Sequence, residues 1–190
     1  CDEQAPCLQI THWSYQSMGA ANASHPEVLR DIRRRFGHRP IGAEVPVPKT
    51  AKQCAALRDR QIRAVKRKGD AILYLLDRPW RLFLTGVCEG HRAGHNLWPV
   101  DGDFAWDAAP DALLEVYEEL DHQLARILTR VERDGSDTSV LLFALHGMEP
   151  NRAQNHFLSE IVDRLNRRYL GGAALPTDKA RTPNFMAYLR

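Results

Sequence analysis

The fold is predicted chiefly from residues 82–88, which read Leu82-Phe83-Leu84-Thr85-Gly86-Val87-Cys88. This short, nearly continuous apolar run is typical of a strand that is buried on both faces of a sheet. A second run of the same kind follows further along the chain, at Val140-Leu141-Leu142-Phe143-Ala144-Leu145. We therefore predict two core strands in which Phe83, Val87, Leu141 and Phe143 are buried.

Amphipathic helices are predicted around these two strands. Apolar residues recur at helical spacing over about residues 25–36, 50–76, 110–132 and 153–168. The order strand, helix, strand, helix favours an α/β fold with a parallel sheet and crossover helices. Residues 39–50 contain three prolines, which fix φ and remove backbone donors, so this stretch is predicted to be a Pro-rich surface loop.

Chain length and charge limit the classes of protein to which this sequence can belong. The chain has 190 residues, which suits a single α/β domain or the central fragment of a larger one. Its 26 basic and 24 acidic residues leave a net charge of +2, too small for a polyanion-binding surface. We expect the basic residues between positions 58 and 68 to form a solvated helix face, and nucleic acid is not an expected partner.

Two further features bear on the compartment. No apolar run approaches the roughly 18 residues that span a bilayer, and no signal peptide is visible, so no membrane partner is expected and a cytoplasmic location is predicted. The four cysteines form no Cys-x-x-Cys pair. A Cys1–Cys7 disulfide is possible, but free thiols are favoured because a chain of this length can bury a core without cross-links.

Three histidines follow the predicted strands. His91 and His95 come just after the first strand, and His146 comes just after the second. If the strands are parallel neighbours, all three histidines lie at the same sheet edge, where open α/β sheets bind ligands. Neutral imidazole is the commonest protein ligand for zinc. The alternative is that these are loop histidines bonded to carbonyl groups or to Glu89, and the residues alone leave both interpretations open.

The two histidine motifs resemble those of the type I phosphodiesterase/nucleotide pyrophosphatase branch of the alkaline phosphatase superfamily. His91, Gly94-His95 and Trp98 are similar to its Asp-x-x-Gly-His metal loop, and residues 142–148 are similar to its Ser-Asp-His-Gly-Met loop. The similarity extends over about residues 25–168. It implies part of an alkaline-phosphatase-like three-layer sandwich, with Trp98 packed beside the metal loop.

The resemblance also implies a function. It indicates a metal-dependent hydrolase of phosphate monoesters or diesters, acting on a small-molecule phosphate ester with one or two divalent ions, usually zinc. His91 and His95 would then bind one metal and His146 the second. Alone, the chain could hold at most one ion, with all three histidines as its ligands.

The chain departs from the family pattern in ways that bear on activity. Leu145 stands where the family usually has an aspartate ligand of the second metal, and leucine cannot coordinate a metal. No nucleophile motif is recognised, so no catalytic residue is assigned. We expect the nucleophile to lie on the remainder of the polypeptide or on a second chain. The alternative is a degenerate, non-catalytic family member that acts as a binding or scaffold module.

Overall fold

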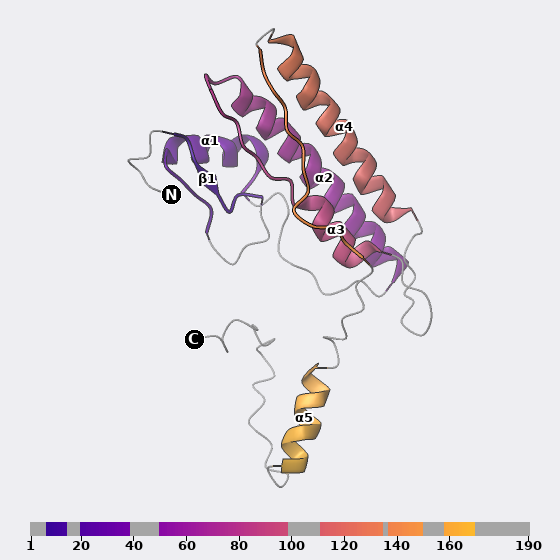
Figure 1. The fold of residues 1–190 in the computed structure, drawn as a ribbon. Helices are drawn as coiled ribbons and strands as arrows, with labels where there is room; N and C mark the ends of the chain where they lie inside the picture. Colours follow the sequence, from indigo (N-terminus) through magenta and orange to yellow (C-terminus); the bar gives the residue numbers. More distant parts are fainter. Residues whose placement is uncertain are drawn as a thin grey trace. The chain divides into compact units, whose positions relative to one another are not determined.

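The computed structural model describes residues 7–14, 20–38, 50–98, 111–134, 137–149 and 158–169. The predicted Pro-rich loop at residues 39–50 lies outside these ranges except for Thr50. The order of elements is β1 (Ile10–Thr11), β2 (Asn22–Ala23), α1 (Pro26–Phe36), α2 (Ala51–Leu76), α3 (Glu89–Leu97), α4 (Ala112–Arg133) and α5 (Leu158–Tyr169) (Figure 1). Four of these helices correspond to the predicted ones.

Local sequence explains where the main helices begin and end. Thr50 and Gln53 form a capping box at the start of α2, each side chain bonding to the other's backbone N–H, which satisfies two otherwise unpaired donors. Pro26 lies in the first turn of α1. Gly37 ends this helix with φ at +94°, a value that favours glycine.

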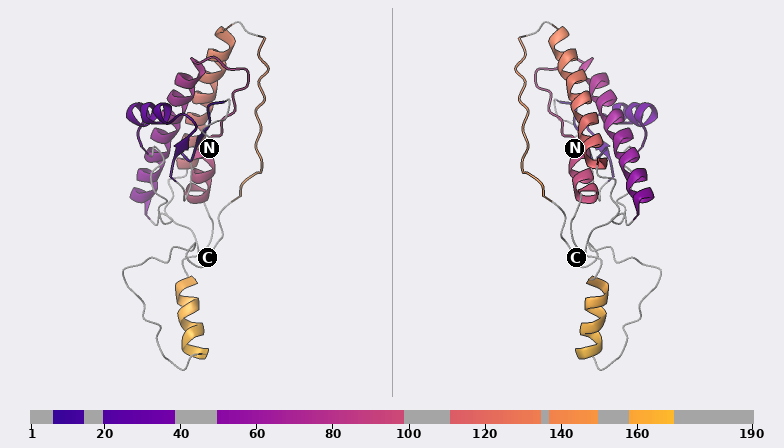
Figure 2. Two further views of the ribbon diagram at one scale, coloured as in Figure 1. Left: turned by 90° about the vertical axis from the view of Figure 1, so that its left-hand side faces the viewer. Right: turned by 90° about the vertical axis from the view of Figure 1, so that its right-hand side faces the viewer.

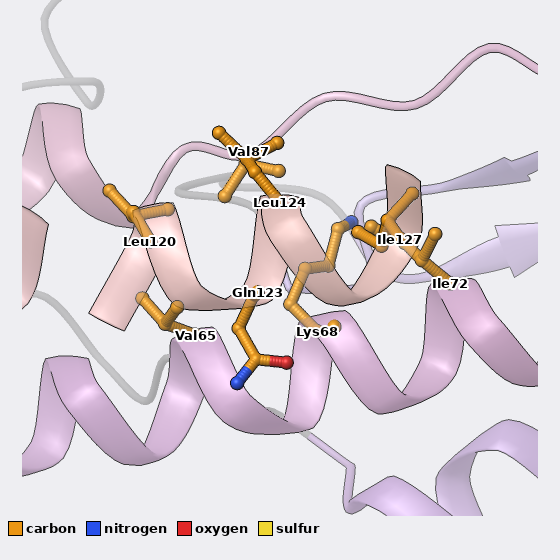
Figure 3. A pocket seen from close by; sticks show the side chains of 9 residues that line it. Val65, Lys68, Ile72, Val87, Leu120, Gln123, Leu124 and Ile127 are labelled. Carbon is orange, nitrogen blue, oxygen red and sulfur yellow. The ribbon is translucent and has the colours of Figure 1, made fainter. Parts of the chain in front are cut away.

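Helices α2 and α4 lie side by side and run in the same direction (Figure 1). Their partially exposed ion pairs advance together along both helices: Arg58–Glu115, Lys66–Glu119, Asp70–Arg126 and Asp77–Arg130. Between the helices, Gly69 admits the side chain of Gln123, because a Cβ at this position would lie 2.2 Å from its Oε1. Figure 3 shows Gln123 directed toward α2, with Val87 from another segment beside α4. The remaining cavity is about 10 Å³, room for at most one water molecule.

Two hydrophobic clusters form the core. The first joins α2, α3 and α4 through Cys54, Leu57, Val65, Ala93, Leu97, Ala112 and Val116. The second joins α1, α2 and the β-hairpin through Trp13, Ala23, Val28, Leu29, Ile32 and Ala71. The Trp13 indole also donates a 2.9 Å hydrogen bond to the carbonyl of Gly37, which ties the hairpin to the end of α1.

The described residues form a mixed fold of helices with one small sheet. That sheet pairs β1 and β2 antiparallel, with Ile10 opposite Ala23. The chain is extended over residues 82–87 and 137–144, where the strands 82–88 and 140–145 were predicted, but within the described ranges neither segment belongs to a sheet. We call them the extended segments. Figure 1 shows both running from the far ends of α2 and α4 back toward α3, and Figure 2 shows them from two sides.

The predicted burial of the extended segments is wrong, because none of the four residues is buried. Leu141 is 83% exposed and Phe143 is 61% exposed, and Phe83 and Val87 are only partly covered. The physical reason is that a strand buried on both faces needs neighbouring strands, and the described residues supply none. Val87 gains its cover from the α2–α4 pair instead.

The chain divides into two compact units, Cys1–Asn151 and Arg152–Arg190. Within the second unit, α5 is amphipathic, and its apolar residues Ile161, Val162, Leu165 and Tyr169 are exposed. None of the described helices is both long and apolar enough to cross a membrane. Cys7, Cys54 and Cys88 are free thiols, and Cys1 lies outside the described residues.

Candidate functional site

Helix α3 carries the first histidine motif. The sequence analysis predicted no helix here and placed His91 and His95 just after a strand, whereas the structure has a helix over residues 89–97. The two glycines serve close packing rather than a turn. A Cβ on Gly90 would lie 2.7 Å from a Leu120 methyl group, and one on Gly94 would lie 2.9 Å from the sulfur of Met148. Glycine here lets neighbouring elements approach the helix axis.

The three predicted site histidines lie close together. His91 and His95 are four residues apart on one face of α3, and their Nε2 atoms are 2.9 Å apart. The ring of His146, just after the second extended segment, has its centroid 5.2 Å from that of His91. His91 is therefore the middle member of the cluster. The two motifs meet although they are far apart in the sequence.

Protonation of the cluster follows from its contacts. A carbonyl can only accept, so the 3.0 Å contact between His146 Nδ1 and the Gly147 oxygen requires the proton on Nδ1, which leaves the Nε2 lone pair of the neutral ring available. The pKa of His91 lies below its ordinary value, first because burial disfavours the imidazolium and then because His95 and His146 are near. At 2.9 Å, the two Nε2 atoms attract only when a proton or a cation lies between them.

The donor types suit a divalent transition metal, but the present geometry is incomplete. Two nitrogens bound to one zinc ion at about 2.0–2.1 Å are at most about 4.2 Å apart, a limit that the His91–His95 pair meets. Among the residues that the structure describes, however, no group of three or more histidine, cysteine or acidic side chains is arranged to hold a metal ion. The pair is in place, and the ring of His146 lies next to that of His91.

Met148 joins the two motifs. Its thioether packs against Gly94 on α3, and Trp98 lies on the same side, 3.9 Å from the position that a Gly94 Cβ would occupy. Trp98 thus lies beside the histidine motif, as predicted. Because Met148 is two residues from His146, this contact positions the second motif against the first. The contact between Gly94 and Met148 therefore packs the second motif against α3.

A buried carboxyl group lies at the start of α3, in a residue that the sequence analysis considered only as a possible partner of the histidines. Glu89, at the start of α3, is fully buried and accepts a 2.6 Å hydrogen bond from the Ser14 hydroxyl. Burial raises its pKa, although the Ser14 bond and Lys68 act in the opposite direction. Glu89 thus bonds to Ser14 rather than to the histidines. The only sequence signal was an acid next to an apolar run, because Ser14 is remote in sequence.

Comparison with known families identifies the chain's relatives. The model of the family described as type I phosphodiesterase/nucleotide pyrophosphatase matches residues 10–186, which is most of the chain. The chain belongs to this family. Comparisons with curated proteins and with solved structures gave no match. The resemblance inferred from the two histidine motifs is therefore confirmed, and the match extends beyond them at both ends.

Family membership supports phosphodiesterase- or pyrophosphatase-type chemistry for this type I phosphodiesterase relative. The matched region contains both extended segments, both histidine motifs and Glu89. Leu145, in the position that the sequence analysis compared with an aspartate ligand, is 88% exposed. Its side chain provides no donor next to His146.

Proposed function

We propose that this type I phosphodiesterase relative is a metal-dependent hydrolase of phosphate monoesters or diesters, and that His91, His95 and His146 bind a divalent cation. The observation that carries the proposal is the meeting of two separate motifs at His91, with one imidazole 2.9 Å from its Nε2 and another ring 5.2 Å away by centroid. Isolated surface histidines have no reason to converge. The substrate proposed is a small-molecule phosphate ester.

Each histidine has a distinct task in this proposal. His91 and His95 supply a helix-borne pair of nitrogens, and His146 supplies a third donor through Nε2 because its Nδ1 is held by Gly147. A bound zinc ion would supply Lewis-acid stabilisation of the negative charge on phosphate oxygens. Zinc is proposed because imidazole nitrogens are among its preferred ligands. The proposed site binds one or two divalent ions, as the family resemblance implies.

The proposed fold is an alkaline-phosphatase-like sandwich in which the extended segments are parallel strands. The parallel α2–α4 pair supports this, since each helix is followed by a segment that returns in the same direction (Figure 1). Strand, helix and return are the parts of a βαβ unit. The nucleophile is proposed to lie on the remainder of the polypeptide or on a second chain.

A non-catalytic binding or scaffold role is the second candidate, and Leu145 favours it. A solvent-exposed leucine beside His146 adds no metal ligand and offers no charge to a second ion. A chain of this kind would retain the first metal position without the second. The two candidates predict the same metal at His91 and His95 but different turnover.

The test measures zinc content and hydrolysis on the full chain. We expect zinc affinity to fall at least tenfold in His91→Ala and in His95→Ala, because each removes a nitrogen from the pair. The matched control is His122→Ala, a histidine on α4 whose side chain is 65% exposed. Zinc is measured by mass spectrometry after dialysis, and hydrolysis with bis-p-nitrophenyl phosphate.

The outcomes separate the candidates. Equal zinc content in His95→Ala and in His122→Ala would contradict the metal site. Zinc binding that depends on His95 without hydrolysis would favour the non-catalytic role. Zinc-dependent hydrolysis by this chain would support the enzyme and overturn the expectation that its nucleophile lies elsewhere.

A further inference from the structure

Helix α3, which carries two of the site histidines, is weak by its own sequence. It has nine residues, fewer than the about 12–15 that an isolated helix needs to be stable in water. Gly90 and Gly94 lower its helix propensity further. Its N-cap residue, Cys88, makes no side-chain capping hydrogen bond within the described part of the chain. The helical geometry that pairs His91 with His95 therefore depends on contacts with other elements.

One such contact is the hydrogen bond between Ser14 and Glu89. Glu89 is the first residue of α3, two positions before His91, and its carboxyl group accepts the 2.6 Å bond from the Ser14 hydroxyl. Glu89 is 0% exposed and Ser14 is 4% exposed, so water does not compete for the bond and the low dielectric strengthens it. The bond joins the region of the N-terminal hairpin to the first turn of the helix that carries the histidine pair.

The segment that carries Ser14 is itself held firmly in place. The backbone φ is +54° at Ser14 and +61° at His12, values that are uncommon for residues other than glycine and persist where the surrounding structure imposes them. Between these two residues, Trp13 is buried and its indole bonds to the Gly37 carbonyl. The ammonium group of Lys68 lies 5.6 Å from the centre of a Trp13 ring. A hydroxyl group that is fixed in this way can fix the side chain to which it bonds.

We propose, on the basis of the metal site proposed above, that Ser14 and Glu89 are positioning residues of that site. Their hydrogen bond keeps the first turn of α3 helical and so keeps His91 and His95 on one face, while neither residue binds the metal. Metal binding and the ordering of α3 are linked, because a cation can use both imidazole nitrogens only when the helix holds them together. Loss of the Ser14 hydroxyl should therefore weaken zinc binding about tenfold, the lower end of the effect of residues that orient metal ligands.

The test measures the zinc affinity of the full chain by competition with a chromogenic chelator. Ser14→Ala and Ser14→Gly both remove the hydroxyl, and glycine in addition suits the positive φ at this position. Both variants should bind zinc about tenfold more weakly than the parent chain. The matched control is Ser24→Ala, which removes another buried serine hydroxyl, one that donates a 3.0 Å hydrogen bond to the Cys7 carbonyl. This control should keep the zinc affinity of the parent chain.

Variants of Glu89 separate positioning from a general loss of stability. Glu89→Gln keeps an oxygen that can accept from the Ser14 hydroxyl and should keep zinc affinity within about threefold, whereas Glu89→Ala should lose about tenfold. The double variant Ser14→Ala/Glu89→Ala should lose no more than either single variant, because both remove the same bond. The Arg92 amide donates to the Cys88 carbonyl at 3.1 Å. Hydrogen exchange of this amide in the zinc-free chain should be about tenfold faster in Ser14→Ala than in Ser24→Ala.

The outcomes distinguish failure of the positioning role from failure of the metal site. Equal zinc affinity in Ser14→Ala and Ser24→Ala, together with a loss in His95→Ala, would overturn the positioning role and leave the metal site intact. A loss in Glu89→Gln as large as that in Glu89→Ala would also overturn it, because the hydrogen bond would then not be the cause. A parent chain that binds no zinc would overturn both.

Discussion

The two extended segments are richer in apolar residues than the three packed helices, yet they are far less covered. Val65, Leu97 and Val116 are at most 1% exposed in the helical cluster, whereas Leu82 and Leu141 in the extended segments are more than 80% exposed. An amphipathic helix buries its apolar stripe against one neighbour. A core strand needs neighbours at both edges and on both faces. Apolar content therefore predicts burial only where the required partners are present.

The largest expected difference between the two regions is in the cost of truncating a leucine. Leu97→Ala should lower the free energy of unfolding by about 2–5 kcal/mol, because it opens a cavity in a closed cluster. Leu141→Ala should change it by less than about 0.5 kcal/mol. Urea denaturation followed by circular dichroism measures both. A comparable loss in Leu141→Ala would show that this segment is buried in solution.

The next effect concerns the Ser14–Glu89 hydrogen bond. Ser14→Ala should cost about 1–3 kcal/mol, because a buried carboxyl group loses its 2.6 Å donor. Ser139→Ala, at an exposed position in the second extended segment, is the matched control and should stay within about 0.5 kcal/mol of the parent chain. Equal stability of the two variants would mean that the Ser14 bond is not formed in solution.

Glu89 should also give the packed region a distinct pH dependence. Its folded-state pKa is raised above 4.5 by burial, so at intermediate pH the folded chain holds a proton that the unfolded chain has lost. The free energy of unfolding should then fall as pH rises from about 4.5 to the folded pKa, and level off above it. Glu89→Gln should remove this slope, and exposed Glu149→Gln should retain it. Denaturation at a series of pH values measures the difference.

The smallest effect should come from the ion pairs between α2 and α4. Asp70→Asn should cost no more than about 1 kcal/mol, since Asp70 and Arg126 are 46% and 38% exposed. The cost should disappear at about 1 M salt, where screening extends over only about 3 Å. Asp137→Asn is the control in the extended region. A cost that persists at high salt would indicate a contribution other than charge.

Helices were predictable from the sequence because their determinants are local. Apolar spacing, the Thr50–Gln53 capping box and Gly37 locate α1 and α2 to within a residue or two. Helix α3 was missed because Gly90 and Gly94 suggest a turn, while their actual role depends on Leu120 and Met148, which approach from distant parts of the chain. Pairing of the extended segments could not be inferred from their own residues.

The candidate site was predicted in part. The sequence analysis placed His91 and His146 after two apolar segments that run in the same direction, and it therefore expected them to lie close together. The two rings are indeed close, although His91 lies on a helix. The Ser14–Glu89 bond was not predictable, since it joins the N-terminal hairpin region to α3 and neither residue has a distinctive neighbourhood. Contacts that follow from the path of the backbone could be inferred from the sequence. Contacts that depend on how distant side chains pack could not.

The parallel direction of α2 and α4 has a topological consequence. Two parallel neighbouring helices cannot be joined by a tight turn, so the chain must run back along the pair between the end of α2 and the start of α4. Both extended segments begin at the C-terminal ends of these two helices and run back toward α3, which carries His91 and His95 (Figure 1). The meeting of residues 91 and 146 is thus set by the route of the backbone. It should persist through extensive surface substitution.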